Sequence, residues 1–404
     1  MKVQILILGN GFAGISALET LRAVDRTLSV SLVAREPHPF YSPASLFAFL
    51  EGRVERQHLF LRPPEFYVQP GLKTFLGRRV SRLEASARTV LLDDGTRLPY
   101  DRLLLATGAS ARLPEIPGRE AQGVFKLDTL ADAEAIRRHS PRRAVVVGAG
   151  WIGVGLAAAL AEQGAQVDLI EVAETILLGV FHQEVAAVIM KMLHDHGVQV
   201  RLGEKIAEIH GDPVTAVQID KEAIPCDSVF LAVGRRPNLD FVDPAEVPLG
   251  PGGGVLVDDR LHAGQGIYAA GDCAEPLDFL GHRAIHAVIP TAIETGRIAA
   301  LNMAGRSTPY AGSINANALQ IFGQAFFSIG FLEGEKVLRR VRDRLHLFVL
   351  QGNRLVGAQF AGEAPEAAQA RTVIRRGIAL EGAFNFDALQ KRLFLPVVFP
   401  NPNR

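Results

Sequence analysis

The segment Lys2-Val3-Gln4-Ile5-Leu6-Ile7-Leu8, followed by Gly9-Asn10-Gly11-Phe12-Ala13-Gly14, decides the fold of this 404-residue chain. The first seven residues form an apolar run of strand length, and the glycines then follow the spacing G-x-G-x-x-G. Apolar residues at Ala17, Leu21 and Val24 repeat at the spacing of a helix. A strand that enters a helix through such a loop is typical of a Rossmann-like α/β unit.

The same plan occurs a second time in the chain. Ala144–Val147 is an apolar run that leads into Gly148-Ala149-Gly150-Trp151-Ile152-Gly153, and an apolar helical pattern follows. Further on, Gly77–Leu83 is echoed by Gly203–Ile209, and Asp101–Gly108 is echoed by Asp227–Gly234. A duplication over this length predicts two related α/β units rather than one large sheet. Within the first copy, Asp93-Asp94-Gly95 predicts a hairpin.

Each glycine loop is followed by an acid at the distance that dinucleotide binding requires. Val30–Val33 is a second apolar strand and Glu36 comes just after it, while Val167–Ile170 is followed at once by Glu171. The glycines allow a tight turn and a close approach of the pyrophosphate, and the acid accepts from the ribose hydroxyls. The sequence therefore predicts two dinucleotide sites.

Composition narrows the class of protein. Lys plus Arg equals Asp plus Glu, so the formal net charge is zero, and a nucleic-acid partner is not expected. No signal peptide is recognised after Met1, and the uncharged stretch 144–161 is interpreted as strand, turn and helix rather than as a membrane span. Cys226 and Cys273 are the two cysteines, too few for a disulfide framework. We expect a cytoplasmic protein without an integral membrane segment, and no metal-ligand spacing is present.

The segment Gly266-Ile267-Tyr268-Ala269-Ala270-Gly271-Asp272 completes a more specific pattern. Together with the two glycine loops, it resembles the pyridine nucleotide–disulfide oxidoreductase superfamily over essentially the whole chain. Glu36–Tyr41, Leu113–Gly118 and Tyr310–Ser313 are similar to segments of its NADH:rubredoxin, nitrite-reductase-type and coenzyme A-disulfide-reductase-like branch. The resemblance implies that FAD binds the first unit, NAD(H) binds the second, and Asp272 holds the ribityl and pyrophosphate end of the flavin.

The resemblance also assigns site residues. For FAD these are Gly9, Gly11, Phe12, Ala13, Gly14, Glu36, Val80, Thr107, Gly108, Gly271, Asp272 and Thr291. For NAD they are Gly148, Gly150, Trp151, Ile152, Gly153, Glu171 and Gly234. No metal ligand is assigned.

The implied fold is α/β, with two Rossmann-like domains, the second inserted in the first, and a C-terminal α+β interface domain. We expect the FAD domain at residues 1–111 and 247–311 and the NAD(H) domain at 112–246. The C-terminal domain, at 312–404, commonly builds a dimer interface in the superfamily, so a homodimer is expected.

Cysteine positions depart from the disulfide-reducing members of the superfamily. Those members carry a redox-active pair beside the first helix or a single reactive Cys after the second strand. Here Ala44 occupies the approximate place of the single Cys, and Cys226 and Cys273 are interpreted as small buried residues. Reduction of a disulfide or of coenzyme A-disulfide is therefore not expected.

A second departure concerns a charged pair beside the flavin. Many relatives place a Lys near flavin N5 and a Glu on the second glycine-rich helix, and the corresponding residues here are Ala48 and Gly155. Loss of both partners is physically coherent, because either charge alone in a dry site would be costly. The departure puts the usual nicotinamide geometry in doubt, but not the fold.

The chemistry implied by the resemblance is hydride transfer from nicotinamide C4 to flavin N5, which requires the two rings to stack. Pro290 opens a helix whose N-terminus would face the flavin, and the main-chain N–H of Thr291 would stabilise negative charge at N1 and O2. His282 and His286 lie between Asp272 and this helix. A proton relay there is one interpretation, and ordinary loop or core histidines are the favoured one.

The sequence indicates which nucleotide and what kind of electron acceptor to expect. Glu171 is followed by Val172-Ala173-Glu174-Thr175, which offers no cation to a 2′-phosphate, so NADH is favoured over NADPH. We expect the reduced flavin to pass electrons to an external acceptor, either a small redox protein or a partner subunit.

Two other functions stay open from the sequence. A quinone reductase at the membrane surface would use the apolar tail 393–399 for docking, although Thr291, Ala292 and Glu294 stand where type II NADH dehydrogenases place a Gln pair. The other alternative is a flavin-binding scaffold subunit that no longer turns over NADH, which the departures at Ala48 and Gly155 favour.

Overall fold

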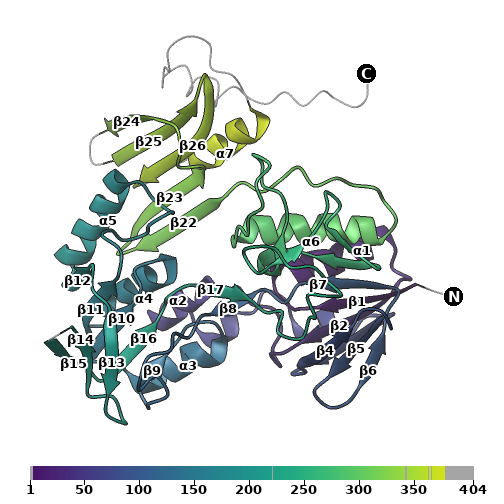
Figure 1. Ribbon diagram of the computed structural model, residues 1–404, viewed down its shortest axis with the longest axis horizontal. Helices are drawn as coiled ribbons and strands as arrows, with labels where there is room; N and C mark the ends of the chain where they lie inside the picture. The colour runs from purple at the N-terminus through teal and green to yellow at the C-terminus, as the bar shows by residue number, and fades with distance from the viewer. Residues whose placement is uncertain (1–2, 221, 342–343, 363, 365, 378–404) are drawn as a thin grey trace. The chain divides into compact units, whose positions relative to one another are not determined.

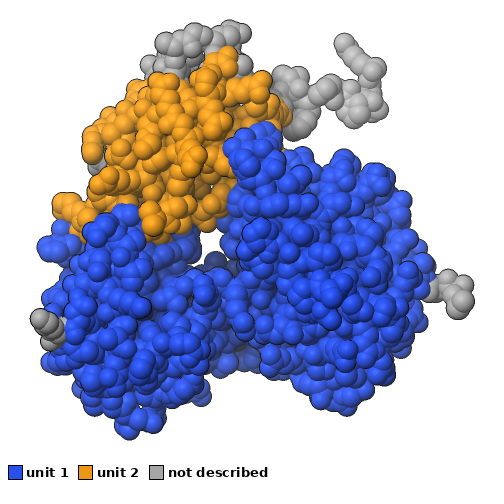
Figure 2. Space-filling view, viewed as in Figure 1, with its two compact units in different colours: residues 1–176, 193–313 blue, residues 177–192, 314–404 orange. Residues whose placement is uncertain are grey.

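The computed structural model describes residues 3–377, except 221, 342–343, 363 and 365. The chain divides into two compact units, which Figure 2 colours separately. The larger unit comprises residues 1–176 and 193–313, and the smaller one comprises 177–192 and 314–404. The apolar tail 393–399 lies outside the described residues.

A six-stranded sheet forms the first half of the larger unit (Figure 1). Its order is β19 (His262–Gly264), β20 (Ile267–Ala269), β7 (Arg102–Leu105), β1 (Gln4–Leu8), β2 (Ser29–Ala34) and β3 (Leu72–Leu76). All neighbours are parallel except β19 and β20. Helices α1 (Phe12–Val24) and α6 (Ile289–Met303) lie side by side against it.

The apolar run that precedes the first glycine loop is the centre of this sheet. Ile5, Leu6, Ile7 and Leu8 are all buried, because β1 has parallel neighbours on both edges and structure on both faces. The buried face of α1 includes Leu18 and Leu21, at helical spacing. The strand and helix expected here are therefore confirmed.

A five-stranded parallel sheet forms the second half of the larger unit. Its order is β12 (Val198–Leu202), β11 (Gln166–Glu171), β10 (Arg143–Val147), β16 (Ser228–Leu231) and β9 (Val124–Phe125). Helices α3 (Leu130–His139) and α4 (Trp151–Glu162) belong to it. The uncharged stretch 144–161 thus forms most of a strand and a helix, as expected.

The internal duplication extends to two small antiparallel sheets. One contains β4 (Val80–Glu84), β5 (Thr89–Leu92) and β6 (Arg97–Pro99), and the other contains β13 (Ile206–His210), β14 (Ala216–Ile219) and β15 (Glu222–Pro225). Strands β5 and β6 pair around Asp93–Gly95, which confirms the hairpin expected there.

Short elements connect the two halves. The strands β8 (Ala109–Ala111) and β17 (Arg235–Pro237) pair antiparallel, so the two passages of the chain between the halves lie side by side. The remaining short elements, which do not link the halves along the chain, are α2 (Ser45–Leu50), η1 (Arg56–His58), η2 (Pro64–Tyr67), η3 (Gly271–Cys273), β18 (Val255–Leu256) and β21 (Ala274–Glu275).

In its described residues, the smaller unit contains an antiparallel sheet, helix α7 (Glu366–Arg376) and most of helix α5 (Gln183–Asp195). The sheet order is β22 (Ala316–Ile321), β23 (Gln324–Gly330), β26 (Arg354–Ala361), β25 (Arg344–Gln351) and β24 (Glu335–Val341), and α7 follows it. The unit also includes Leu177–Met192, which contains most of α5. Buried Ser328 and Gln359 both donate to the carbonyl oxygen of Val180 and so hold this segment to the sheet.

Candidate functional site

The first glycine loop is shaped by two close approaches and one open space. A Cβ on Gly9 would lie 2.0 Å from the carbonyl oxygen of Ala106, and one on Gly14 would lie 2.0 Å from the carbonyl oxygen of Gly9. Neither position can carry a side chain. A Cβ on Gly11, in contrast, would meet nothing within 4 Å. The open side of Gly11 is where a phosphate can approach the backbone.

The second loop repeats this geometry residue by residue. A Cβ on Gly148 would lie 2.5 Å from the carbonyl oxygen of Ala232, and one on Gly153 would lie 1.7 Å from that of Gly148. Gly150, like Gly11, faces open space. Because both loops keep only the middle glycine free of protein contacts, both fit the cradle of a dinucleotide.

Helix N-termini supply the electrostatics of both cradles. Gly11 and Gly150 are the N-caps of α1 and α4, and neither helix has an acidic residue in its first turn. The free N–H groups and the helix dipole therefore favour an anion at each loop. Both loops lie at the carboxyl ends of parallel strands, the edge at which α/β sheets bind ligands.

The N-terminus of α6 lies beside the first loop. A Cβ on Gly296 would lie 2.2 Å from the carbonyl oxygen of Ala13, so α6 and α1 are in backbone contact. Gly271 packs 3.1 Å from the Ala13 methyl group by the same measure, and its N–H donates to Oγ1 of Thr295. Thr291 is buried in the first turn of α6. The structure thus brings Gly271, Thr291 and the first loop together.

Asp272 lines a cavity of about 530 Å³. Arg235, Glu275 and Arg283 lie on the same cavity wall. Burial raises the pKa of the Asp272 carboxyl, and the nearby Arg235 guanidinium opposes that shift only in part. A carboxyl group held in this way is suited to accept hydrogen bonds from a hydroxyl-rich ligand.

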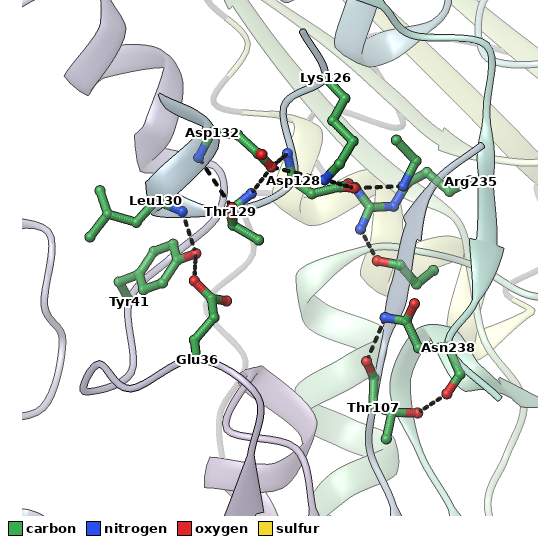
Figure 3. A network of polar contacts seen from close by, with 12 residues as sticks. Glu36, Tyr41, Thr107, Lys126, Asp128, Thr129, Leu130, Asp132, Arg235 and Asn238 are labelled. Carbon is green, nitrogen blue, oxygen red and sulfur yellow. Dashed lines mark hydrogen bonds and ion pairs between the residues drawn. The ribbon is translucent and has the colours of Figure 1, made fainter. Parts of the chain in front are cut away.

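Glu36 is held at the end of β2 by an aromatic residue. The hydroxyl of Tyr41 donates to Oε2 of Glu36 at 2.8 Å and accepts from the N–H of Leu130, in the first turn of α3, at 2.9 Å (Figure 3). Burial raises the pKa of the Tyr41 hydroxyl, so it stays a donor. The orientation of Glu36 is therefore fixed from the second half of the unit.

The carboxylate of Glu171 is held by two main-chain N–H groups. Its Oε2 accepts from the N–H of Ala149 at 2.7 Å, and its Oε1 accepts from the N–H of Ala173 at 3.0 Å. The carboxylate therefore lies directly beside the second glycine loop, where a nucleotide ribose would lie.

A polar network joins the passages between the halves (Figure 3). Thr107 and Asn238 exchange two hydrogen bonds, from Oγ1 of Thr107 to the Asn238 carbonyl at 2.8 Å and from Nδ2 of Asn238 to the Thr107 carbonyl at 2.9 Å. Arg235 pairs with Asp128 at 3.2 Å and donates to the carbonyl of Ala109.

Lys126 extends this network to the N-terminus of α3. Its ammonium lies 3.1 Å from Oδ2 of Asp128 and 3.0 Å from Oδ2 of Asp132. Desolvation alone would lower the pKa of Lys126, but the two carboxylates outweigh it and raise that pKa. Thr129 and Asp132 form a capping box on α3, so the network ends on a fixed helix.

Comparison with known proteins decides the class. A family model described as pyridine nucleotide-disulphide oxidoreductase matches residues 3–299. The chain belongs to this family. The fold, the FAD and nicotinamide dinucleotide cofactors, and the oxidoreductase class expected from the sequence are thereby confirmed. The open cradles at Gly11 and Gly150 fit these two dinucleotides.

Three similar proteins illustrate the family. The epsilon subunit of an NADH-dependent phenylglyoxylate dehydrogenase from Aromatoleum evansii is 30% identical over 374 residues, which cover 90% of this chain and 86% of that one. A chlorobenzene dioxygenase ferredoxin reductase component from Cupriavidus sp. strain PS12 is 30% identical over 396 residues, 95% of each chain. The solved ferredoxin reductase of the CYP199A2 system of Rhodopseudomonas palustris is 26% identical, with a TM-score of 0.90, and covers 97% of this chain and 100% of that one.

Both cysteines of this family member are buried. Cys273 follows Asp272 and its thiol donates to the carbonyl of Leu105 at 3.2 Å, while Cys226 lies in the core of the second half. Burial raises the pKa of Cys226 to about 12 and also raises the pKa of Cys273. The interpretation of both as small buried residues is confirmed.

The two histidines near Asp272 differ from each other. His282 is largely exposed, with Nδ1 3.8 Å from Oδ2 of Asp278. Burial lowers the pKa of His286, with Asp278 opposing the shift only in part. His286 is therefore neutral near pH 7 and is not poised as a charged relay.

Other expected site residues lie around these loops. Phe12 packs edge-on against Phe40, Gly108 accepts a hydrogen bond from the N–H of Asn238, and Gly234 accepts one from the N–H of Arg112. Trp151 and Ile152 are the first residues of α4. Val80 begins β4 and packs on the core beside the six-stranded sheet.

Several residues of the site were not expected from the sequence. Tyr41, Arg235, Asn238 and Asp128 were assigned no role, although Tyr41 follows Glu36 by five residues, Arg235 directly follows Gly234 and Asn238 lies four residues after Gly234. Their proximity in sequence to assigned residues is the signal that could have found them. Asp128 carries no such signal.

Ala48 and Gly155, which stand where many relatives carry a charged pair, lie in surroundings that differ further from that pattern. A Cβ on Gly155 would lie 3.0 Å from Cε1 and from Cζ of Phe47, the residue before Ala48. An aromatic ring, rather than a Lys side chain, thus lies against this part of α4. Ala48 is in α2, where its carbonyl accepts from the N–H groups of Arg53 and Val54.

The described part of the chain offers neither a metal-binding cluster nor a membrane-spanning helix. No group of three or more His, Cys, Asp or Glu side chains is arranged to hold a metal ion there. Over the same residues, no helix combines the length and apolar character that crossing a bilayer requires.

Proposed function

We propose that this chain is an NADH:acceptor oxidoreductase in which FAD occupies the first cradle, NADH occupies the second, and the flavin passes electrons to a separate redox protein or partner subunit. The observation that carries this proposal is the repeated loop geometry, in which only Gly11 and Gly150 are open. When bound, the two cofactors supply a hydride donor and a carrier that can release two electrons one at a time.

The acidic residues and the helix N-termini of the site have specific roles in this proposal. The N–H groups at the start of α1 and α4 bind the two pyrophosphates, and Glu36 and Glu171 accept from the two adenosine riboses. Asp272 accepts from the ribityl hydroxyls of FAD. The main chain at Thr291, with the N-terminus of α6, stabilises negative charge at the pyrimidine edge of the flavin.

The charge at Glu171 supports NADH over NADPH. Its carboxylate stays beside the loop because it accepts two main-chain N–H groups, and it would repel a 2′-phosphate. The residue that follows, Val172, is apolar and largely exposed, and therefore offers no compensating cation.

The state of the cysteines supports electron transfer without a protein disulfide. Cys226 and Cys273 are buried and their raised thiol pKa values disfavour the nucleophilic thiolate. The reduced flavin therefore needs an outside acceptor. Ferredoxin reductases among the relatives and a dehydrogenase subunit support a small redox protein or a partner subunit in that role.

We also propose the domain division 1–111 with 247–311, 112–246, and 312–404, a homodimer built through the last domain, and a cytoplasmic location. The pairing of β8 with β17 marks the two passages between the first two domains and supports their boundaries near residues 111 and 235–246.

Anaerobic mixing tests the proposed function. The flavin absorbance near 450 nm should bleach with NADH and far more slowly with NADPH, and a [2Fe–2S] ferredoxin should then restore it. A flavin that does not bleach at saturating NADH would overturn the proposal and favour the scaffold subunit, which the absence of charge at Ala48 and Gly155 also motivates. Re-oxidation by menadione on liposomes but not by ferredoxin would favour a quinone reductase.

A further inference from the structure

Two helices from different halves of the larger unit meet at one contact of unusual closeness. Gly155 is buried on α4, and the Phe47 ring of α2 lies so close to it that an added Cβ would be 3.0 Å from two of the ring carbons, which is tighter than ordinary van der Waals contact. The ring therefore packs against α4 at a position that has no side chain.

A second contact holds α2 along α4. The side-chain amide of Gln163 donates to the carbonyl oxygen of Glu51 at 2.9 Å. Gln163 lies eight residues beyond Gly155, which is about 12 Å further along the helix. On another side of α2, the Arg137 guanidinium lies 4.4 Å from the centre of the Phe49 ring. Helix α2 is thus braced by both α3 and α4.

The two contacts of α4 differ in stiffness and in place. A ring packed closely on a glycine has little slack, since an added methyl group would force the ring to shift by a few tenths of an ångström. A hydrogen bond from a long Gln side chain tolerates small displacements. Gly155 lies five residues after the loop glycine Gly150, whereas Gln163 is the C-cap of the helix. The stiff contact is therefore the one beside the nucleotide cradle.

This position matters for the chemistry of the proposed function. The two cradles belong to different halves of the unit, so the spacing between the halves sets how far apart the reacting rings lie. Hydride transfer needs the reacting atoms about 3–3.5 Å apart, and a misplacement of about 1 Å can cost about 100-fold in rate. An apolar ring at this junction also adds no unpaired charge to a dry site.

We propose that Phe47 is a positioning residue for hydride transfer, which sets the spacing between the two cofactor-binding halves by packing its ring on Gly155. The inference rests on the proposed function. It explains why this chain can lack charge at both Ala48 and Gly155: the ring replaces a charged link between the halves with an apolar one.

A double-mutant cycle on the FAD-loaded protein tests the contact. Phe47→Ala should weaken NAD⁺ binding and slow the limiting rate of flavin reduction by NADH, the latter by about tenfold or more. Gly155→Ala should weaken NAD⁺ binding in the wild-type background, because its Cβ displaces the ring. In the Phe47→Ala background the same substitution should have almost no effect, because the space is then free. Calorimetry measures the binding and stopped-flow absorbance measures the rate.

Two further variants separate positioning from general support of the fold. Gln163→Ala removes the distant contact and should leave NAD⁺ affinity and the reduction rate near the wild-type values. Phe47→Leu, which keeps bulk but not the ring, should give intermediate values. Unfolding midpoints of all variants identify any that are merely destabilised, and a fall in midpoint without a change in NAD⁺ binding would overturn the proposal.

The outcomes for the two proposals are distinct. If Phe47→Ala and Gly155→Ala act independently on NAD⁺ affinity, or if neither changes it, Phe47 is not a positioning residue, whatever the enzyme does. If the two couple in NAD⁺ binding but wild-type flavin is not reduced by NADH, the positioning of the nucleotide stands and the proposed function fails.

Discussion

Arg235 lies 3.2 Å from Oδ1 of Asp128, whose side chain is only 3% exposed. The same carboxylate accepts from the N–H of Ala111 at 2.8 Å and pairs with Lys126 at 3.1 Å. Asp128 thus ties the first passage between the two halves, through Ala111, to the second, through Arg235. The pairing of β8 with β17 is therefore reinforced by charge at its centre.

Arg235→Ala should lower the free energy of unfolding by about 2 kcal/mol, because it leaves a buried carboxylate with only part of its compensation. Arg236 is a matched control on the same strand, since its partner Asp240 and its own side chain are both about 60% exposed. Arg236→Ala should cost less than about 0.5 kcal/mol. Urea unfolding measures both, and equal losses would contradict the structural role of Asp128.

Gly11→Ala and Gly150→Ala should fold and lose different cofactors. Neither added methyl group meets protein, but each would occupy the space a pyrophosphate needs. Gly11→Ala should purify colourless with a near wild-type circular dichroism spectrum, while Gly150→Ala should keep its flavin and show a raised KM for NADH. Gly14→Ala, whose methyl group would overlap the Gly9 carbonyl, should fail to fold. A yellow Gly11→Ala protein would remove the first loop from the FAD site.

The sequence was sufficient to predict those structural features that depend on residues close together in one loop. Each glycine loop with its following acid occupies fewer than about 30 residues, and the spacing encodes a strand, a turn and a helix. The roles of Gly9, Gly14, Gly148 and Gly153 follow from that local geometry. The buried state of both cysteines was also predictable, since each lies in or next to an apolar strand.

Contacts between distant segments were not predictable. Phe47 meets Gly155, and Arg235 meets Asp128, only because two sheets pack in a particular way, and no local pattern encodes that packing. The grouping of Leu177–Met192 with the C-terminal sheet has the same cause, because it depends on buried Ser328 and Gln359 finding the Val180 carbonyl. The periodicity of a single sequence predicts the helices and strands, but it does not predict which of them pack against one another.

Nucleotide preference should change with charge beside the second loop. Glu171→Ala combined with Val172→Arg should lower kcat/KM for NADH and raise it for NADPH, because a carboxylate is removed and a cation is added where a 2′-phosphate would lie. Steady-state rates with both nucleotides measure the change. Val172→Arg alone is the control, and it should gain less because Glu171 still repels the phosphate. A double variant with unchanged preference would show that Glu171 does not contact the ribose.

Removal of both thiols should leave turnover intact. Cys226→Ser with Cys273→Ser should retain the wild-type rate of flavin reduction by NADH, and native wild-type protein should resist iodoacetamide at pH 7.5, because burial raises both thiol pKa values. Both cysteines should react once the chain is unfolded. Rapid alkylation of the native protein with loss of activity would reveal a redox-active thiol. It would contradict a mechanism in which the flavin passes electrons directly to an outside acceptor.

Asp272→Asn should have opposite effects on the apoprotein and on flavin binding. Burial raises the pKa of Asp272 in the folded chain, so the unfolded chain releases this proton first as pH rises. The stability contributed by protonated Asp272 is complete below about pH 4, the ordinary value for an aspartate, and is lost as pH rises through the folded pKa. The wild-type apoprotein should therefore lose stability relative to Asp272→Asn over that window, as unfolding midpoints at a series of pH values would show.

In the holoprotein the carboxylate of Asp272 instead accepts hydrogen bonds from the ribityl hydroxyls, so Asp272→Asn should bind FAD about tenfold more weakly or worse. Tighter FAD binding by Asp272→Asn would show that the carboxylate does not face the flavin as we propose, and identical pH profiles of the two apoproteins would show that burial does not raise its pKa.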